Sequence, residues 1–281
     1  MKPSRIDDTF HRLRAERRPG LITYITAGDP DLPRSAEILT ALDRAGADVL
    51  EIGVPFSDPL ADGPVIQRAT ERALSAGGSL RASLSLIARV RPLVSAPIIV
   101  FSYVNPLMRM GVAAFARQAA SAGVDGVLAL DLPIEEAEDF RETLGASGLD
   151  TIFLVGQTTS DARIKRAAAL GRGFLYGISR LGVTGARDRV ASGAEALARR
   201  IRAHTAMPIA LGFGISHPDH VAEIGGYADA AVVGSALVSL IAQESGSPQL
   251  TESVEEYVHW LKGDSARATA QVGEARGVPR A

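Results

Sequence analysis

Residues 50–64, "LEIGVPFSDPLADGP", begin as an apolar strand and then break into a loop with three prolines and two glycines. The stretch also holds three carboxylates, Glu51, Asp58 and Asp62, in a chain that is otherwise mostly apolar. A buried strand that ends in a stiff, acidic loop is typical of an α/β fold that does its chemistry at the carboxyl ends of its strands.

Along the chain, eight short runs rich in β-branched residues alternate with longer Ala-, Leu- and Arg-rich segments of helical period. The runs are apolar almost throughout, as parallel strands covered on both faces are. The predicted strands are residues 21–26, 48–53, 97–102, 126–131, 151–155, 173–178, 208–213 and 230–234. The predicted helices lie near residues 33–45, 80–92, 111–122, 136–147, 160–170, 192–204, 217–225 and 235–243. Eight strand–helix units favour a closed (β/α)8 TIM barrel over an open doubly wound sheet.

Two further helices are expected outside these units, an N-terminal one over residues 5–16 and a C-terminal one over residues 250–262. No linker or change of composition marks a second domain. We therefore expect one barrel domain over residues 1–262, followed by a disordered tail over residues 263–281.

The composition excludes several classes of protein. A net charge of −2 provides no basic field for nucleic acid or anionic lipid. The absence of cysteine excludes disulfides and thiolate chemistry. No segment has the pattern of a secretory signal or of a membrane span. We expect a cytoplasmic protein that binds neither nucleic acid nor membrane.

Three loops that follow predicted strands contain glycine, namely residues 182–185, 212–214 and 234–235. Glycine lets backbone N–H groups approach an anion, and the start of a helix adds a favourable dipole. Each loop taken alone is equally a tight turn. The three together on one face of a barrel favour a phosphorylated ligand.

Three catalytic strategies are open to such a barrel. A Schiff base needs a lysine at a strand end, and Lys2, Lys165 and Lys262 all lie elsewhere. A metal site needs clustered ligands, but the five histidines are scattered; the pair His217 and His220 is interpreted as a capping and surface feature. Carboxylate acid–base catalysis remains, with no metal.

Glu51 is the best candidate for that chemistry, because it interrupts an apolar strand and should point into the barrel mouth. A carboxyl group there loses its water, so its pKa should rise toward neutrality. A buried structural acid is the alternative. From the residues alone, Asp62 is either a second functional acid or a turn-forming residue, and neither role is favoured. For Asp58 they favour a turn or interface role.

The sequence resembles the tryptophan synthase α family from about residue 6 to residue 262. The resemblance is carried by "LEIGVPFSDPLADGPVIQRA" (50–69) together with "TYITAGDP", "YVNPLMRMG", "DLPIEE", "LYGISRLGVTGAR", "GFGIS" and "VVGSA", in this order. It implies a lyase that cleaves indole-3-glycerol phosphate to indole and glyceraldehyde 3-phosphate by a retro-aldol reaction.

The resemblance also implies residue roles. Glu51 would be the general acid–base, and Asp62 would accept the indole N–H hydrogen bond. The positions that match the phosphate-binding loops are Gly185, Gly214, Gly234 and Ser235. Those that match the indole pocket or the coupling of mobile loops are Tyr24, Tyr103, Asp131, Tyr176 and Thr184.

A partner is implied as well. The family forms an αββα tetramer with a β subunit, which holds pyridoxal phosphate and receives the indole, whereas the α chain uses no cofactor of its own. The positions that match the partner-facing surface are Pro55, Asp58, Pro59, Asn105 and Pro133.

Two departures from the family pattern are expected to border the pocket floor: "VGQTT" (155–159), which includes Gly156 and Gln157, and Gly177. They leave open a stand-alone, indole-releasing lyase of specialised metabolism. A catalytically silent activator of a pyridoxal enzyme conflicts with the presence of both Glu51 and Asp62. A phosphosugar isomerase would leave the proline-rich loop unexplained.

Overall fold

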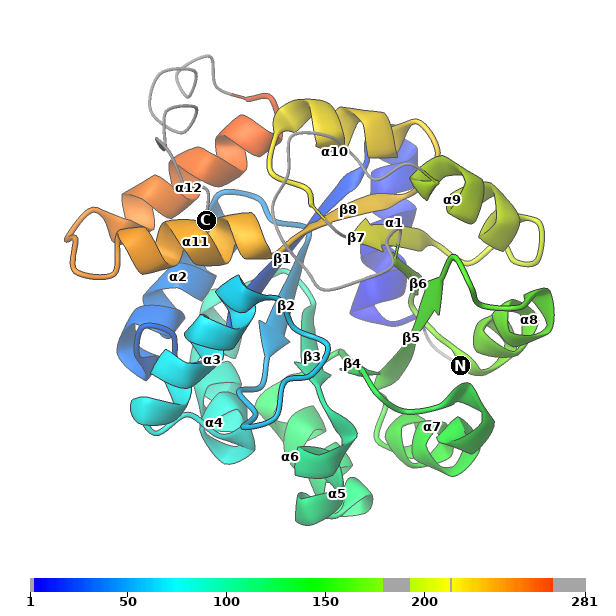
Figure 1. Cartoon of the computed structure of the whole chain (residues 1–281), viewed down its shortest axis with the longest axis horizontal. Coiled ribbons are helices and arrows are strands. Elements are labelled where there is room, and N and C mark those ends of the chain that lie inside the picture. Colours follow the sequence, from blue (N-terminus) through cyan, green and yellow to red (C-terminus); the bar gives the residue numbers. More distant parts are fainter. Residues whose placement is uncertain (1–2, 179–192, 213, 265–281) are drawn as a thin grey trace, which may run out of the picture.

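The protein is a closed barrel of eight parallel strands that follow one another in sequence order, which confirms the predicted fold (Figure 1). The computed structural model describes residues 3–178, 193–212 and 214–264. The strands are β1 (Gly20–Thr26), β2 (Val49–Gly53), β3 (Ile98–Ser102), β4 (Gly126–Ala129), β5 (Asp150–Gly156), β6 (Leu175–Ile178), β7 (Ile209–Gly212) and β8 (Ala230–Val233).

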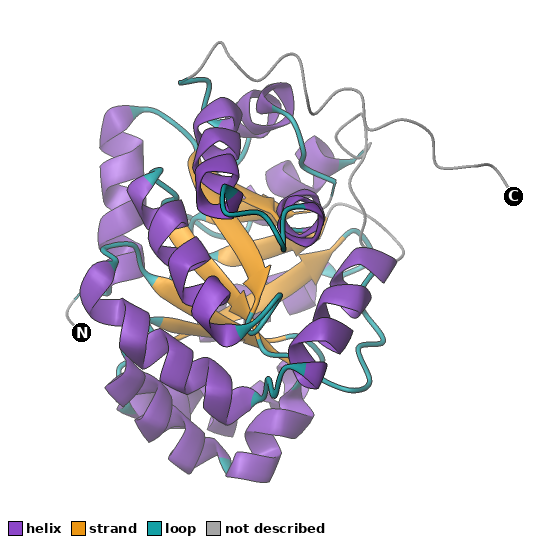
Figure 2. Cartoon of the chain, turned by 90° about the vertical axis from the view of Figure 1, so that its left-hand side faces the viewer, coloured by secondary structure: helices purple, strands orange, loops and turns teal. Residues whose placement is uncertain are grey.

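Helices cover the outside of the barrel on all sides (Figures 1 and 2). They are α1 (Arg5–Glu16), α2 (Leu32–Arg44), α3 (Pro64–Ser75), α4 (Leu80–Val90), α5 (Val104–Met110), α6 (Val112–Ala122), α7 (Ala137–Ala146), α8 (Asp161–Leu170), α9 (Ala194–Arg202), α10 (Pro218–Gly225), α11 (Ser235–Gln243) and α12 (Leu250–Leu261), with short 3₁₀ turns at Arg91–Leu93 and Ile134–Glu136. Within the described ranges, no helix is long and apolar enough to cross a membrane.

Two of these helices, α3 and α5, were not predicted. Helix α3 begins at Pro64, the last proline of the acidic loop, because proline at the first helical position has the required backbone angle and needs no N–H partner. Helix α5 has no side-chain cap of its own; the N–H of Val104 donates instead to Asp131, which lies 27 residues further along the chain. A start signal supplied from so far away leaves no local trace in the sequence.

Helix α1 closes the N-terminal end of the barrel, as expected for the extra N-terminal helix. Its Ile6, Phe10 and Leu13 belong to the same buried cluster as the inward side chains of the strands. Glycines make room for it: a Cβ on Gly20 would lie 2.7 Å from Leu13 Cδ1, and one on Gly126 would lie 2.9 Å from Ile6 Cδ1. In the part of the chain that the structure describes, the N-terminal end of the barrel is therefore filled by side chains, and the C-terminal end is left for a ligand.

The C-terminal helix α12 was also predicted, and it packs against α2 and α11. Most of the predicted tail, residues 265–281, lies outside the described residues. The domain limits of 1–262 and 263–281 thus stay a prediction.

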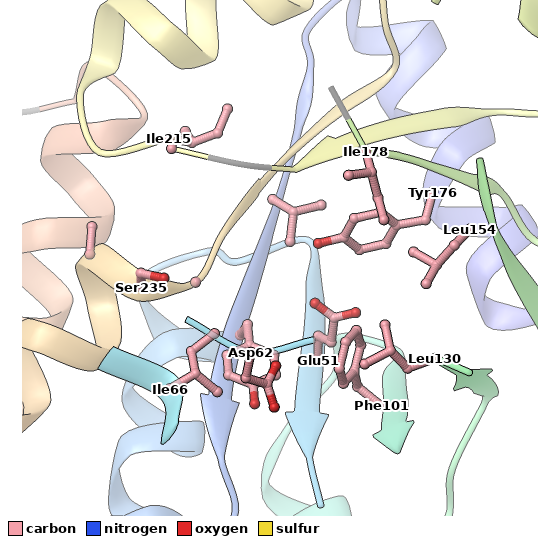
Figure 3. A pocket seen from close by; sticks show the side chains of 15 residues that line it. Glu51, Asp62, Ile66, Phe101, Leu130, Leu154, Tyr176, Ile178, Ile215 and Ser235 are labelled. Carbon is pink, nitrogen blue, oxygen red and sulfur yellow. The ribbon is translucent and has the colours of Figure 1, made fainter. Parts of the chain in front are cut away.

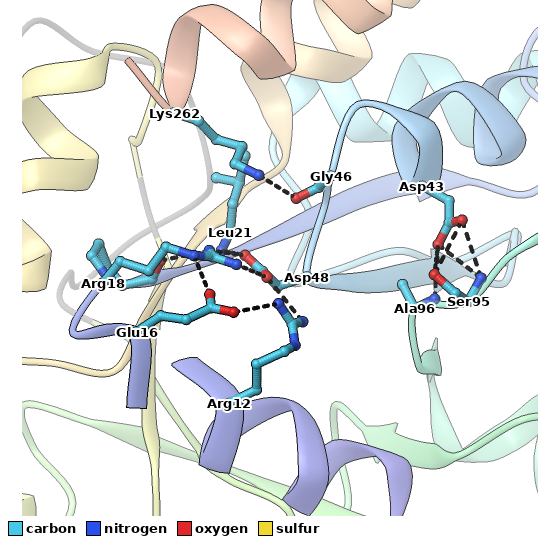
Figure 4. Close-up of polar contacts among 11 residues, drawn as sticks. Arg12, Glu16, Arg18, Leu21, Asp43, Gly46, Asp48, Ser95, Ala96 and Lys262 are labelled. Atoms are coloured by element: carbon cyan, nitrogen blue, oxygen red, sulfur yellow. Dashed lines mark hydrogen bonds and ion pairs between the residues drawn. The ribbon is translucent and has the colours of Figure 1, made fainter. Parts of the chain in front are cut away.

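The segment that joins α1 to the barrel is fastened by a buried carboxylate just before β2 (Figure 4). Asp48 is 3% exposed and accepts two hydrogen bonds of 2.8 Å from the guanidinium of Arg18. It also accepts from the N–H of Leu21 (3.0 Å) and, at 3.3 Å, from the exposed Arg12. One side chain therefore ties the start of β1 and the α1–β1 turn to β2.

We predict that Asp48→Ala lowers the free energy of unfolding by about 2–4 kcal/mol, because it leaves Arg18 and the Leu21 N–H without their acceptor. Arg12→Ala is the matched control: it removes an exposed partner of the same carboxylate and should cost less than about 1 kcal/mol. Urea unfolding monitored by circular dichroism measures both. Equal losses for the two variants would contradict this account of the cluster.

Candidate active site

A pocket opens at the C-terminal end of the barrel (Figure 3). It combines two carboxyl groups, two tyrosines, backbone of the β7 and β8 loops and a large apolar wall. The lining residues are Tyr24, Glu51, Asp62, Ile66, Phe101, Leu130, Leu154, Tyr176, Ile178, Gly214, Ile215, Val232, Gly234, Ser235 and Ala236.

Glu51 lies in the middle of β2, in register with Tyr24 of β1 and Ile99 of β3. Its side chain is 1% exposed, and its Oε1 has no hydrogen-bond partner in the part of the chain that the structure describes. Loss of water raises the pKa of Glu51 from 4.5 to about 8. At neutral pH Glu51 is therefore mainly a carboxylic acid, with a proton available to the pocket.

Asp62 reaches the pocket from the loop between β2 and α3. Tyr103 Oη donates to Asp62 Oδ2 at 3.3 Å and accepts from the Ala61 N–H at 3.0 Å, so one hydroxyl holds both the loop and the acid. Gln67 Nε2 donates to the Asp62 carbonyl at 2.8 Å. Burial raises the pKa of Asp62 to about 6, and the Tyr103 hydrogen bond opposes that rise. At neutral pH Asp62 is mainly a carboxylate.

The two pocket tyrosines each occupy space left by a glycine on the neighbouring strand. A Cβ on Gly53 would lie 2.1 Å from Tyr24 Oη, and a Cβ on Gly212 would lie 2.5 Å from Tyr176 Oη. Tyr24 also meets the ring of Phe101 edge to face, with centroids 5.6 Å apart. These glycines are required for close approach, and they let full-size aromatic rings enter the upper layer of the barrel without closing the pocket.

The glycine loops after β7 and β8 line the same pocket as the acids. Gly214 has a φ of +82°, a backbone conformation that favours glycine, and Gly234 precedes Ser235, the first residue of α11. Figure 3 shows Ser235 and Ile215 across the pocket from Tyr176, with Glu51 and Asp62 in the lower part of the view. Thr184 and Gly185, which the sequence also indicated, lie outside the described residues.

Other residues indicated by the sequence lie away from the pocket wall. Asp131 is exposed, and its Oδ1 accepts from the Val104 N–H at 2.7 Å. Of the partner-surface positions, Asp58, Asn105 and Pro133 are exposed and Pro59 is half-buried. Pro55 is buried within this chain, against Gly78, and so does not belong to the exposed surface.

The expected placement of the two departures at the pocket floor is wrong. Because Tyr176 points inward, Gly177 points outward, and a Cβ on it would lie 2.4 Å from Leu211 and 3.6 Å from Leu197 of α9. Gln157 lies beside Gly193, and its carbonyl accepts from Arg200 at 3.0 Å. Neither departure lines the pocket, so they give no reason to expect altered chemistry.

The apolar wall was not singled out from the sequence. It consists of Ile66, Phe101, Leu130, Leu154, Ile178, Ile215, Val232 and Ala236. Most of these residues lie near the end of a strand, two positions after a residue that points into the barrel. Because strand residues two positions apart share a face, the sequence pattern could have predicted that they point inward as well.

The two histidines that the sequence analysis paired, His217 and His220, have structural roles. His217 caps α10 by accepting the Asp219 N–H, as predicted, whereas His220 is buried rather than on the surface. Among the residues described, no three His, Asp or Glu side chains are grouped so as to hold a metal ion.

The fold and pocket define a class: a (β/α)8-barrel enzyme in which two buried carboxyl groups of opposite protonation face glycine loops suited to an anion. The chain belongs to the tryptophan synthase alpha chain family, whose sequence profile matches residues 10–266. It is accordingly a lyase of tryptophan biosynthesis.

Individual relatives agree along almost the whole chain. The tryptophan synthase alpha chain of Solibacter usitatus is 45% identical over 94% of this chain and all of the relative. The crystal structure of the α subunit from Legionella pneumophila matches with a TM-score of 0.85 at 34% identity, over 94% of this chain and 98% of the other. A structure of the tryptophan synthase α2β2 complex from Pyrococcus furiosus matches with a TM-score of 0.82 at 40% identity, over 87% and 98%.

We predict that Tyr103→Phe raises the pKa of Asp62 above about 6, because the lost hydrogen bond favours the carboxylate over the acid. Carbon-detected NMR titration of the side-chain carboxyl measures the change, and Asp62→Asn identifies the signal. An unchanged titration would show that Tyr103 does not control this acid.

Proposed function

We propose that this chain cleaves indole-3-glycerol phosphate to indole and glyceraldehyde 3-phosphate, with Glu51 and Asp62 as the catalytic residues. The observation that carries the proposal is that the two acids share one apolar pocket and hold opposite protonation states at neutral pH. A pair of carboxyl groups whose pKa values are pushed apart is the arrangement that acid–base chemistry needs.

In the proposed reaction the Glu51 carboxylic acid donates its proton to C3 of the indole ring. The ring then carries a positive charge on its N–H, which the Asp62 carboxylate stabilises by accepting the hydrogen bond. The Glu51 carboxylate takes the proton from the hydroxyl on the carbon attached to C3. The C–C bond breaks, its electron pair restores the aromatic ring, and the hydroxyl carbon becomes the aldehyde. Glu51 ends protonated, as it began.

The opposite side of the pocket suits the phosphate. Gly214, Gly234 and Ser235 bring backbone to the pocket, and Ser235 opens α11, so that unpaired N–H groups and the helix dipole favour an anion there. By family resemblance, Gly185 would complete this site. The apolar wall, including Phe101 and Leu154, would hold the indole ring.

We further propose that the face around the pocket docks a β subunit in an αββα tetramer. On this face Leu60 is 89% exposed and Met108 is 60% exposed, which is unusual for large apolar side chains. Asp58, Pro59, Asn105 and Pro133 would lie in the same interface. Pyridoxal phosphate would belong to the partner, and the reaction proposed for this chain uses its carboxyl groups alone.

We predict that Glu51→Gln lowers indole release roughly 10²- to 10⁴-fold, because the amide cannot exchange the proton. The folded state should survive, since Oε1 of Glu51 makes no hydrogen bond among the described residues that the change could break. An indole assay together with a melting curve checks both points. Glu142→Gln on the exposed face of α7 is the control, and near-normal turnover in the Glu51 variant would refute the assigned role.

We predict that Leu60→Asp weakens the stimulation of indole release by an added tryptophan synthase β subunit, because it places a charge in an apolar contact. Leu93→Asp is the matched control: Leu93 is 64% exposed but precedes β3, at the opposite end of the barrel. Titration of activity with the β subunit measures the effect. Equal stimulation of both variants would place the interface elsewhere, and full activity without any β subunit would favour a stand-alone lyase.

A further inference from the structure

The loop after β7 presents Gly214 and Ile215 to the pocket, and the backbone of its next residue, Ser216, is hydrogen-bonded to side chains of α10 and α12. Ile215 is buried and Ser216 is half-buried. The position of this loop therefore depends on the contacts that its backbone makes on the side away from the pocket.

Two buried side chains hold the backbone of Ser216. The Ser216 N–H donates to His220 Nδ1 at 3.3 Å, and Tyr257 Oη donates to the Ser216 carbonyl at 3.3 Å. His220 and Tyr257 are each 6% exposed. Burial raises the pKa of Tyr257, so its hydroxyl keeps its proton and remains a donor.

The two side chains come from different elements. His220 lies in the first turn of α10, directly after the loop, whereas Tyr257 lies in α12, 41 residues after Ser216. Helix α12 is additional to the eight strand–helix units. Through Tyr257 it nevertheless reaches the loop that lines the pocket.

An aromatic cluster fixes the position of Tyr257. Trp260 lies three residues further on α12, on the same side of the helix, with its ring centroid 5.7 Å from that of Tyr257. The ring of His217 meets Trp260 edge to face at 4.9 Å. His217 also caps α10, so the loop, α10 and α12 are packed as one unit.

We propose that Tyr257 and His220 are positioning residues for the phosphate end of the substrate. By holding both peptide groups of Ser216, they fix Gly214 and Ile215 at the pocket, so that backbone N–H groups meet the phosphate without reordering. Preorganised donors bind an anion more tightly than donors that must first be ordered. The inference rests on the proposed function for the identity of the ligand, and it adds a role for α12.

The test separates the phosphate end of the ligand from the ring end. Tyr257→Phe removes only the hydroxyl, and we expect it to raise the KM for indole-3-glycerol phosphate roughly 2- to 12-fold, with kcat changed less than about twofold. By calorimetry, binding of glycerol 3-phosphate should weaken by a similar factor, while binding of indole stays unchanged. Tyr227→Phe is the matched control. It also removes a tyrosine hydroxyl, but that hydroxyl lies beside Glu223, whereas the hydroxyl of Tyr257 lies at Ser216.

His220 supplies a second pair of variants. His220→Ala removes the acceptor and should weaken glycerol 3-phosphate binding, whereas His220→Asn places an amide oxygen near the position of Nδ1 and should restore most of it. A purely structural role would instead weaken glycerol 3-phosphate and indole alike, together with a fall in melting temperature.

The outcomes distinguish this inference from the proposed function. If the wild-type chain releases indole but Tyr257→Phe leaves glycerol 3-phosphate binding unchanged, or weakens both ligands equally, the positioning role is overturned and the lyase stands. If the wild-type chain releases no indole while Tyr257→Phe still weakens glycerol 3-phosphate selectively, the positioning role stands and the substrate assignment fails.

Discussion

Removing a carboxyl oxygen from water without giving it a hydrogen-bond partner costs free energy, and Oε1 of Glu51 is such an atom in the part of the chain that the structure describes. Its neighbours across the strands are Tyr24 and Ile99, and the pocket around it is mostly aliphatic and aromatic. The barrel can bear this arrangement because the remainder of its interior is tightly filled, from the inward strand residues down to α1. The proton that Glu51 retains at neutral pH follows from that packing.

Asp62 shows the opposite solution for a second acid in the same pocket. It sits on a loop and keeps a hydrogen bond from Tyr103, which favours the charged form. Two carboxyl groups thus acquire different protonation states from their surroundings. Glu51 lies in an apolar part of a strand and keeps its proton, whereas Asp62 accepts a hydrogen bond from Tyr103, directly after β3, and is charged. The glycines opposite Tyr24 and Tyr176 preserve the space in which both acids face a ligand.

The barrel could be predicted because each strand is a short apolar run with a clear helical segment after it. Glu51 was predicted to point inward because it interrupts an apolar strand, and period-two alternation along β2 agrees with this, since Val49 also points inward. The same alternation, applied to β6, would have shown that Gly177 points outward once Tyr176 points inward. Asp62 could not be assigned from the residues alone, because its orientation depends on Tyr103, 41 positions away. Helix α5 was missed for a similar reason, since Asp131 caps it from another loop. Contacts between distant segments therefore account for most of what the sequence did not reveal.

The packing of Ile6, Phe10 and Leu13 under the strands has one more consequence. Among the described residues, these side chains fill the barrel interior below Glu51, so we expect a molecule bound near Glu51 to enter and leave at the C-terminal rim. The exposed Leu60 and Met108 belong to that rim. The face on which we propose that a β subunit docks is therefore also the face through which small molecules would pass, so a docked partner would control their exchange with solvent.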